Sequence, residues 1–415
     1  MANAQNGDAH ARRVADIQRA LREAGLRGWL FYDFRRSDPL SYRILLLDQN
    51  KFASRRWFYF VPAEGEPTKV VHRIEPGKLD SLPGRRLVYL RWQQLHAHLR
   101  DALSAAGGGG GDDARPQVAM QYSPMGDIPY VSRVDAGTVE LVRSIGVEPV
   151  TSAELVQHFE AVLTPEQKET HDRAADHIHN IILEAFGEIG RRVRAGEETT
   201  EYDIQQFIMR RFEEEGMTSD GAPPIVAANA NSASPHYSPT KDTHSPIRRG
   251  DFVLLDVWAK LKRPGAIYAD QTWTGYVGES VPEEHARVFE IVCGARDAAV
   301  DFLREQVRAG NYVPGREIDD VSRGFIERAG FGEQFVTRTG HSIGEEVHGN
   351  GANIDNLETP DGRRIAPHTC FSIEPGVYQE GLFGVRSEID VYVGDGDIEV
   401  TGRPAQTEVV PILRD

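Results

Sequence analysis

The sequence predicts an α/β protein of the α+β kind, built as two domains that divide near residue 162. In residues 1–162 short apolar runs alternate with helical patterns, which favours a compact α/β domain. In residues 163–415 the order helix, helix, hairpin occurs twice, over 164–275 and 283–391, without an obvious residue-level repeat. A chain of 415 residues is long enough to form two cores.

The first domain is expected to begin with a helix over residues 9–24, because Val14, Ile17 and Leu21 recur at helical spacing and Gly25 follows. The polar residues before it are interpreted as a frayed lead-in. Strands are then expected within residues 28–34, 55–75 (a hairpin that turns at 64–67), 85–92, 116–123 and the first half of 147–156. Helices are expected at residues 92–106, 135–145 and the second half of 147–156. The domain shows no convincing catalytic constellation.

Five consecutive glycines, Gly107–Gly111, lie within this domain and are followed by two aspartates. They do not form a phosphate-binding loop, because no strand-to-helix pattern and no lysine surround them. A flexible surface loop is the expected structure.

Composition excludes several classes of protein. The chain has 47 basic and 63 acidic residues, and its net charge of −16 argues against nucleic acid as the main partner. It contains no apolar run long enough to cross a membrane and no charged-then-apolar leader, so a soluble, cytoplasmic protein without a membrane partner is expected. Cys293 and Cys370 are too few and too far apart to indicate a disulfide framework, and Cys370 is interpreted as a small buried hydrophobe.

The second domain opens with a long helix whose start is marked three times. Thr164 can cap it, Pro165 takes its first position, and Gln167 completes a capping box. The helix is expected to run to about residue 193. Its histidines, His171, His177 and His179, do not share one face and are interpreted as ordinary surface or core-edge residues.

After a further helix at residues 202–215 comes a long run, residues 221–246, rich in Pro, Ala, Asn and Ser. A loop of that length inside a compact domain is usually functional or disordered. It contains His236 in the string NSASPHY. By default a histidine in a polar loop is solvated.

Two aspartates occupy the hairpin that follows, on runs 251–260 and 266–275. Alternation along a strand places Asp256 with Leu254 and Trp258 on one face, and Asp270 with Tyr268 and Thr272 on one face. Both carboxylates lie in apolar strands, where burial is costly unless something positive compensates the charge. A pair of divalent cations would do so.

The stretch after the helices at residues 282–309 and 315–329 supplies three more candidate ligands: His341 in TGHSIGEEVHG, Glu374 in SIEPGVY and Glu388 in VRSEIDV. Four carboxylates would be balanced by two divalent ions, and carboxylates with one imidazole suit manganese, cobalt, zinc or iron. Each residue also has a simpler interpretation: Glu374 as a strand-end turn, and Glu388 with Asp390 as the exposed face of an edge strand paired with Arg386.

In this order and in these local motifs, Asp256, Asp270, His341, Glu374 and Glu388 resemble the dinuclear site of the pita-bread metallopeptidases: methionine aminopeptidase, aminopeptidase P and prolidase, with creatinase as a metal-free relative. The resemblance covers the chain from about residue 163 to the end and, more loosely, the first domain. It implies a creatinase-like N-terminal domain at 1–162, which would contribute to dimerisation and cover the active site. It also implies a pseudo-symmetric pita-bread catalytic domain at 163–415, two divalent ions (Mn, Co or Zn) and a homodimer.

The resemblance also implies residue roles. Glu374 would be both metal ligand and proton shuttle. His236, in a string similar to the family's N-x-x-x-P-H-Y, and His348, seven residues after the ligand histidine, would orient the substrate and stabilise the oxyanion. Arg386 would pair with a ligand carboxylate.

Three positions depart from the family pattern. Asp256 and Asp270 are fourteen residues apart, further than usual, because the hairpin turn is longer. Trp273 replaces the arginine of the usual D-x-T-R, and Thr337 stands where proline-directed members often carry a histidine. Trp273 and Thr337 are assigned to substrate binding or to support of the ligands. Both changes are expected to affect the preference for proline more than hydrolysis itself.

The function expected from sequence is therefore that of a prolidase, a metal-dependent peptidase that cleaves the Xaa-Pro bond of dipeptides. Aminopeptidase P, acting on longer proline-containing peptides, is the nearest alternative. Methionine aminopeptidase is disfavoured by the large first domain, and a creatinase-like amidinohydrolase by the intact ligand set. A catalytically inactive pita-bread module that binds peptides or proteins is the alternative from another class.

Overall fold

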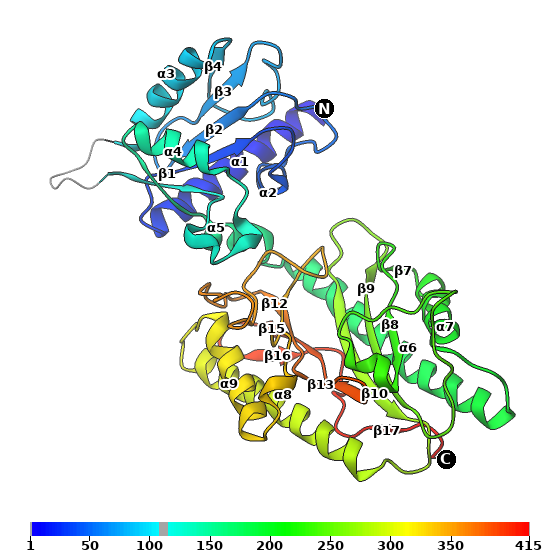
Figure 1. Cartoon of the computed structure of the whole chain (residues 1–415). Helices are drawn as coiled ribbons and strands as arrows, with labels where there is room; N and C mark the ends of the chain where they lie inside the picture. The colour runs from blue at the N-terminus through cyan, green and yellow to red at the C-terminus, as the bar shows by residue number, and fades with distance from the viewer. Residues whose placement is uncertain (1, 108–114, 415) are drawn as a thin grey trace. The chain divides into compact units, whose positions relative to one another are not determined.

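The computed structural model describes residues 2–107 and 115–414, and the side chains from Asp8 onward. The chain forms two compact units, Met1–Glu160 (unit 1) and Ala161–Asp415 (unit 2) (Figure 1). Most of the glycine run, residues 108–111, lies outside the described residues. The mixed α/β fold class predicted from sequence is confirmed.

Unit 1 is a six-stranded mixed sheet of order β4-β3-β2-β1-β5-β6, in which β2 runs against its neighbours. Its strands are β1 (Gly28–Asp33), β2 (Trp57–Pro62), β3 (Thr68–His72), β4 (Arg85–Tyr89), β5 (Gln117–Met120) and β6 (Glu148–Thr151). Its helices are α1 (Ala2–Glu23), α2 (Pro39–Ile44), α3 (Trp92–Leu103), α4 (Ala136–Ser144) and α5 (Ala153–Glu160), with 3₁₀ turns η1 (Ser104–Ala106), η2 (Pro124–Gly126) and η3 (Pro129–Val131).

Helices cover both faces of this sheet. Alternate residues of β1 enter different cores: Trp29 and Phe31 pack with α1, α2 and α5, whereas Leu30 and Tyr32 pack with α3 and α4. Every residue of β1 is therefore buried, as a central strand between two helical layers requires.

Two helical features of unit 1 differ from the prediction. Helix α1 begins at Ala2, so the polar lead-in is helical rather than frayed. Helix α2 was missed because it spans only six residues. Its start is nevertheless marked in the sequence, because Asp38 caps it and Pro39 takes its first position.

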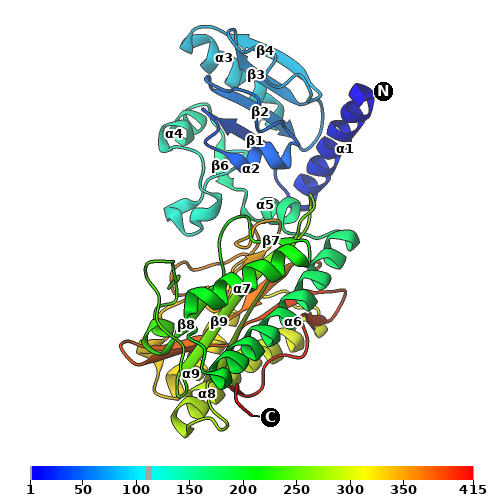
Figure 2. The same cartoon turned by 90° about the vertical axis from the view of Figure 1, so that its right-hand side faces the viewer.

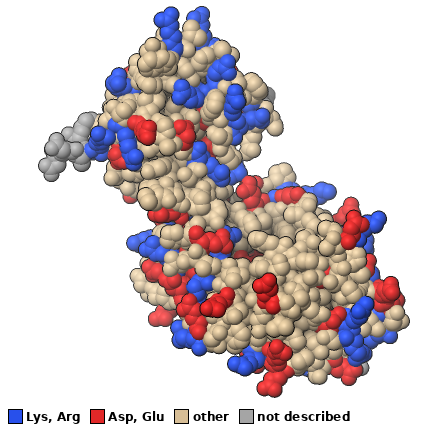
Figure 3. All heavy atoms as spheres, viewed as in Figure 1, with Lys and Arg blue, Asp and Glu red and all other residues tan. Residues whose placement is uncertain are grey.

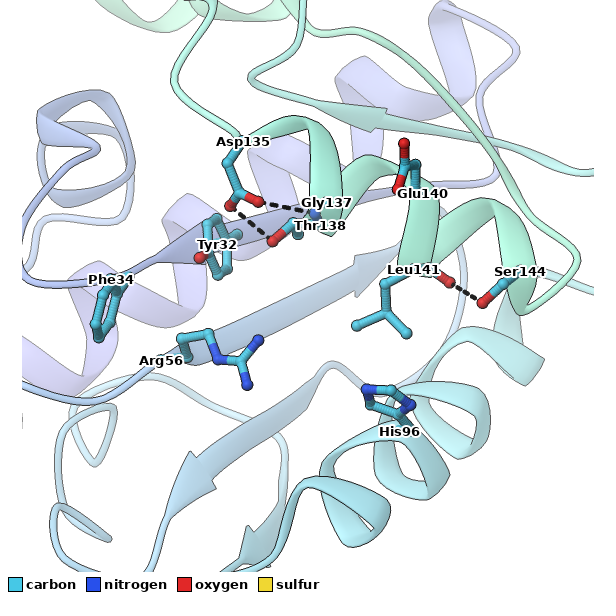
Figure 4. A pocket seen from close by; sticks show the side chains of 10 residues that line it. All are labelled: Tyr32, Phe34, Arg56, His96, Asp135, Gly137, Thr138, Glu140, Leu141 and Ser144. Carbon is cyan, nitrogen blue, oxygen red and sulfur yellow. Dashed lines mark hydrogen bonds between the residues drawn. The ribbon is translucent and has the colours of Figure 1, made fainter.

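A cavity of about 810 Å³ lies beside β1, between α3 and α4 (Figure 4). Asp135 at its edge caps α4 by accepting hydrogen bonds from the Thr138 N–H and hydroxyl at 2.9 and 2.8 Å. Arg56 and His96 enter it from the other side. No metal-binding group is found there among the described residues.

In its described residues, unit 2 contains a five-stranded sheet and a four-stranded sheet, each flanked by a pair of helices, and a two-stranded hairpin (Figure 2). The first sheet holds β7 (Met217–Thr218), β8 (Ile225–Ala228), β9 (Phe252–Leu261), β10 (Ala269–Tyr276) and β17 (Val410–Pro411), and packs with α6 (Pro165–Ala195) and α7 (Glu201–Glu214). The second sheet holds β11 (Ser342–Ile343), β12 (Cys370–Ile373), β15 (Ile389–Val393) and β16 (Ile398–Val400). Beside it lie the helices α8 (Glu283–Arg308) and α9 (Gly315–Arg328) and the hairpin of β13 (Gly376–Gln379) and β14 (Phe383–Arg386). Two 3₁₀ turns complete it, η4 (Asn229–Ala233) and η5 (Gly332–Gln334).

Helix α6 starts as predicted, with the capping box formed by Thr164 and Gln167. It crosses β9 and β10 and contributes much of the first core of unit 2. The packing is close at Gly275, where a Cβ would lie 2.7 Å from the Phe186 ring. A side chain at residue 275 would therefore push α6 away from the sheet.

The long loop predicted at residues 221–246 is only partly a loop, and this part of the prediction is wrong. Residues 225–228 form β8, which pairs antiparallel with β9 and is fully buried, and η4 follows directly. Four apolar residues after two prolines are too few to stand out as a strand by alternation. Pairing with β9, which is distant in sequence, determines their conformation.

No described helix is long and apolar enough to cross a membrane. The acidic excess of the chain belongs to unit 2, while Lys and Arg are prominent on the face of unit 1 seen in Figure 3. Both cysteines are buried and unpaired.

Candidate metal centre

The β9–β10 hairpin places the two predicted aspartates on one face. In its register Asp256 lies opposite Thr272, and Asp270 lies opposite Trp258. Positions 256, 258, 270 and 272 share that face because both strands alternate with a period of two. The longer turn between the aspartates does not disturb this pairing.

The second sheet brings in the remaining three candidate ligands at its strand ends. His341 directly precedes β11, Glu374 directly follows β12, and Glu388 directly precedes β15. Because β12 and β15 pair with Ile373 opposite Ile389, the two glutamates flank the last residue pair of this ladder. The Glu388 N–H donates to the Thr272 carbonyl at 3.2 Å, which joins this sheet to β10.

The five predicted ligands therefore meet at one place. His341 Nε2 lies 3.4 Å from Glu374 Oε1 and 3.7 Å from Asp270 Oδ2. Ligand atoms of Asp270, His341 and Glu388 all lie within 4.8 Å of one another. Asp256 completes the group from the β9 side, where it pairs with Arg386.

Burial of these carboxylates costs free energy unless a cation balances their charge. Asp270 Oδ1 and Glu388 Oε1 are buried and have no hydrogen-bond partner among the described residues. Burial, and then repulsion from the neighbouring carboxylates, raises the pKa of Asp270 and of Glu388 well above the usual range. Arg386 is one cation beside four carboxylates, so most of the charge is left for something else to balance.

The donor chemistry fits divalent metal ions. Burial lowers the pKa of His341 to about 3, so its imidazole is neutral, which is the form that binds metals. Neutral imidazole with several carboxylates is a ligand set for manganese, cobalt, zinc or iron. The two orphaned carboxylate oxygens are the atoms that an ion would satisfy.

Thr272 contacts two of the candidate ligands and was not identified from sequence as a site residue. Its Oγ1 lies 2.6 Å from Glu388 Oε2 and 3.1 Å from Asp256 Oδ1, and accepts a hydrogen bond from Arg386 Nε at 3.0 Å. The hydroxyl therefore connects ligands from both sheets. The available signal was its place on the same strand face as Asp270.

Two further polar residues orient the ligands and were also missed. Ser372 Oγ donates to Glu374 Oε1 at 3.1 Å and accepts from the His341 N–H at 3.0 Å. Asp390 Oδ2 accepts from the Asp270 N–H at 2.8 Å. The Ser372–His341 and Asp270–Asp390 contacts join residues that are 31 and 120 positions apart, so they depend on strand pairing over long sequence separations.

The metal group lines a cavity of about 730 Å³, shared with His236, His348, Arg386 and Thr337. His348 lies beside His341, with the ring centroids 4.4 Å apart and the rings almost perpendicular. His236 reaches the cavity from the loop after η4, and its side chain is exposed.

Trp273 does not lie at this site, which corrects its assignment to substrate binding or ligand support. It belongs to the opposite face of β10, in the core against α6, where its ring meets His179 edge-on at 5.2 Å. Strand alternation is the reason, because residue 273 points away from the face that carries Asp270 and Thr272.

The simpler interpretations of single residues are also decided. Glu388 and Asp390 are not on an exposed edge: both are buried, and β15 lies between β12 and β16.

His171 is neither a surface nor a core-edge histidine. It is fully buried, and its ring nitrogens contact the Tyr268 carbonyl and the Thr401 hydroxyl at 2.7 and 2.8 Å. Cys370 is buried beside it, with Sγ 3.6 Å from His171 Nε2.

Buried carboxylates with a neutral imidazole, open to a cavity between two sheets, are typical of divalent-metal hydrolases. The family is narrower than that class: the chain belongs to metallopeptidase family M24, whose model matches residues 171–395, more than half of the chain. The protein is thus a metallopeptidase.

Similarity to individual proteins extends over almost the whole chain. The "Probable dipeptidase PepE" of Mycobacterium tuberculosis is 27% identical over 419 residues, covering 98% of each chain. The crystal structure of dipeptidase PepE from Mycobacterium ulcerans superposes with a TM-score of 0.66 at 25% identity, covering 98% of this chain and 99% of that one. An Xaa-Pro dipeptidase of Lactobacillus helveticus is 31% identical over 201 residues, 48% of this chain and 50% of its own length.

Proposed function

We propose that the protein is a dinuclear metal-dependent dipeptidase that hydrolyses the Xaa-Pro bond, as a prolidase does. The observation that carries the proposal is the group of buried ligands, with its orphaned oxygens, open to a cavity that also holds two further histidines. Membership of family M24 and the names of the similar dipeptidases support it.

Two ions would be held by Asp256, Asp270, His341, Glu374 and Glu388, with manganese, cobalt or zinc as candidates. When bound, such ions supply Lewis-acid activation of a water molecule and of the scissile carbonyl. Arg386 and Thr272 would keep the ligand carboxylates oriented through the hydrogen bonds described above.

Glu374 is the proposed proton shuttle. It is the most accessible of the four carboxylates, and it lies on the cavity wall. Ser372 and His341 hold one of its oxygens, at 3.1 and 3.4 Å, which leaves the other available to the attacking water and then to the leaving amine.

His236 and His348 would orient the substrate and donate hydrogen bonds to the developing oxyanion. Both line the cavity that the ligands open onto, and neither belongs to the ligand group. Donors aimed at developing charge inside a partly closed site act more strongly than they do in water.

The cavity has room for a dipeptide and has walls of mixed character. Trp258, Val336 and Val347 supply apolar surface, while Arg338 supplies a positive charge that suits a substrate carboxylate. Thr337, proposed to affect the preference for proline, lies on the same wall. An aminopeptidase P acting on longer peptides remains the second candidate, because Val336 and His236 line the cavity and are exposed, so the cavity is not closed to solvent.

The remaining parts of the proposal concern the whole protein. Unit 1 would be the creatinase-like domain, and the protein would work as a cytoplasmic homodimer. These proposals rest on the resemblance and on composition, and size measurement in solution tests the dimer.

Hydrolysis of an Xaa-Pro dipeptide and of an Xaa-Pro-containing pentapeptide tests the function. Metal-stripped protein is resupplied with manganese, cobalt or zinc, and Glu374→Ala is the control variant. Metal-dependent cleavage confined to the dipeptide and lost in the variant is the expected result. Cleavage mainly of the pentapeptide would favour aminopeptidase P. No cleavage of either peptide by metal-loaded protein would overturn both assignments and indicate a different amide substrate, whereas a protein that binds no divalent ion would favour an inactive binding module.

A further inference from the structure

A fully buried glutamate, Glu201, lies behind the loop that carries His236. It is the first residue of α7, directly after the capping residue Thr200. Among the described residues it has no ion-pair partner, so hydrogen-bond donors alone compensate its charge. A buried carboxylate requires such compensation, because burial of an unsatisfied charge is expensive.

Within the described part of the chain, every side-chain hydrogen bond of Glu201 comes from one stretch, residues 228–245. Oε1 accepts from the Ala228 N–H at 2.7 Å and from Asn231 Nδ2 at 2.9 Å. Oε2 accepts from the Tyr237 hydroxyl at 2.6 Å and from the Ser245 N–H at 2.5 Å. Asn231 Nδ2 also lies 3.2 Å from Oε2.

These four donors span the whole loop. Ala228 is the last residue of β8, Ser245 lies where the loop ends, and Asn231 and Tyr237 lie between them. The Glu201 N–H also donates to the Ser245 carbonyl at 3.0 Å. One carboxylate therefore ties both ends and the middle of the loop to the start of α7.

The residue next to the Tyr237 anchor is His236. Ser234, Pro235 and His236 form one wall of the metal cavity. In the described structure the His236 side chain makes no hydrogen bond of its own. Its position at the cavity therefore depends on the neighbouring Tyr237, which Glu201 holds. Tyr237 is half-buried, and desolvation raises the pKa of its phenol, so it remains a neutral donor to Glu201.

A second contact holds the same loop from the other side. Ser232 Oγ accepts from the Gly384 N–H at 2.9 Å, and β14 approaches η4 so closely that a Cβ on Gly384 would meet the Ser232 carbonyl. Strand β14 ends at Arg386. The loop is thus held between α7 and the hairpin that leads to the ligands.

We propose that Glu201 is a positioning residue: its buried carboxylate gathers residues 228–245 and so sets His236 against the metal cavity. This inference rests on the proposed function only for the role of His236, and the placement of the loop is independent of it. Charge-assisted hydrogen bonds are strong and directional, which suits a group that has to hold an otherwise irregular segment.

The test compares Glu201→Gln with Asp203→Asn in manganese-loaded full-length protein. Glutamine would turn an NH₂ group toward N–H and O–H donors, so at least one backbone N–H loses its acceptor. Asp203 lies on the same helix, and its replacement by Asn removes the same charge. Within the described residues its carboxylate accepts hydrogen bonds only from Thr200. Amide hydrogen exchange of residues 229–245, metal content, and kcat and KM on an Xaa-Pro dipeptide are measured.

For Glu201→Gln the loop is expected to exchange faster, while metal content stays at the wild-type value. kcat/KM is expected to fall roughly tenfold to a hundredfold, the range for a displaced substrate-orienting group, with KM raised. Asp203→Asn should keep wild-type exchange in the loop and wild-type kcat/KM. Tyr237→Phe removes one of the four donors, should give an intermediate loss, and carries the test if Glu201→Gln does not fold.

Wild-type exchange in residues 229–245 of Glu201→Gln would overturn the proposal. A loosened loop with unchanged kcat and KM would equally refute the positioning of His236. If the wild-type protein cleaves no Xaa-Pro dipeptide, the proposed function fails, and the exchange data alone then decide whether Glu201 holds the loop.

Discussion

Replacement of Thr272 by valine tests how the ligands are supported. The two side chains have nearly the same shape, so the change removes a hydroxyl from between Glu388, Asp256 and Arg386 with little change in volume. Thr272 donates to a carboxylate at 2.6 Å and accepts from a guanidinium at 3.0 Å. Hydrogen bonds to charged groups contribute about 1.5–3 kcal/mol each.

The free energy of unfolding of the metal-free protein should therefore fall by about 3 kcal/mol, since the partners can regain part of the loss by shifting. Glu388 also loses the group that orients it. Loss of such outer contacts lowers metal affinity by roughly tenfold to a hundredfold. Urea denaturation in the presence of a chelator measures the first effect, and competition with a metal indicator measures the second.

Thr274→Val is the matched control. Thr274 is buried on the same face of the same strand, and its hydroxyl has no partner among the described residues. The change should leave metal affinity unaltered and be neutral or slightly stabilising, because a buried unsatisfied hydroxyl is removed. Equal effects of the two substitutions would refute the assignment of the Thr272 hydroxyl as a support for the ligands.

Three further predictions follow from burial. Burial raises the pKa of Asp270 and Glu388, so protons compete with metal ions for these carboxylates. Metal affinity should therefore fall as pH is lowered through these raised pKa values. Metal binding should also release protons, which calorimetry would detect as a heat that depends on the buffer. Burial also raises the pKa of Cys293 and Cys370, so neither thiol should react with a disulfide reagent until the protein is unfolded. Trp273→Arg would place a charge in the core against α6 and should lower the free energy of unfolding by about 3 kcal/mol or more, measured by thermal or urea denaturation. An unchanged stability would contradict the placement of the Trp273 ring in this core.

The sequence was sufficient where local rules determine the structure. The start of α6 was predicted from Thr164, Pro165 and Gln167, because helix capping depends on residues that are neighbours in the chain. Alternation with a period of two placed Asp256 and Asp270 on one face, whatever the length of the turn between them. The same rule also placed Trp273 on the opposite face, and its assignment to the site followed the family pattern instead.

Long-range pairing explains what sequence could not supply. Strand β8 exists because β9 offers it a partner, and its four residues carry no periodic signal of their own. Thr272, Ser372 and Glu201 make contacts with residues far away in the chain, and the roles proposed for them depend on those contacts. Threonine, serine and glutamate are common residues, so only the folded structure distinguishes these three.

Metal stoichiometry tests the central claim most directly. Metal-stripped protein is titrated with manganese, bound metal is measured per chain, and hydrolysis of an Xaa-Pro dipeptide is followed at each addition. Two ions should bind per chain, with activity appearing as they bind, and Asp270→Asn should bind fewer ions and show no activity. A wild-type protein that binds no divalent ion, or that cleaves the dipeptide equally well without one, would contradict it.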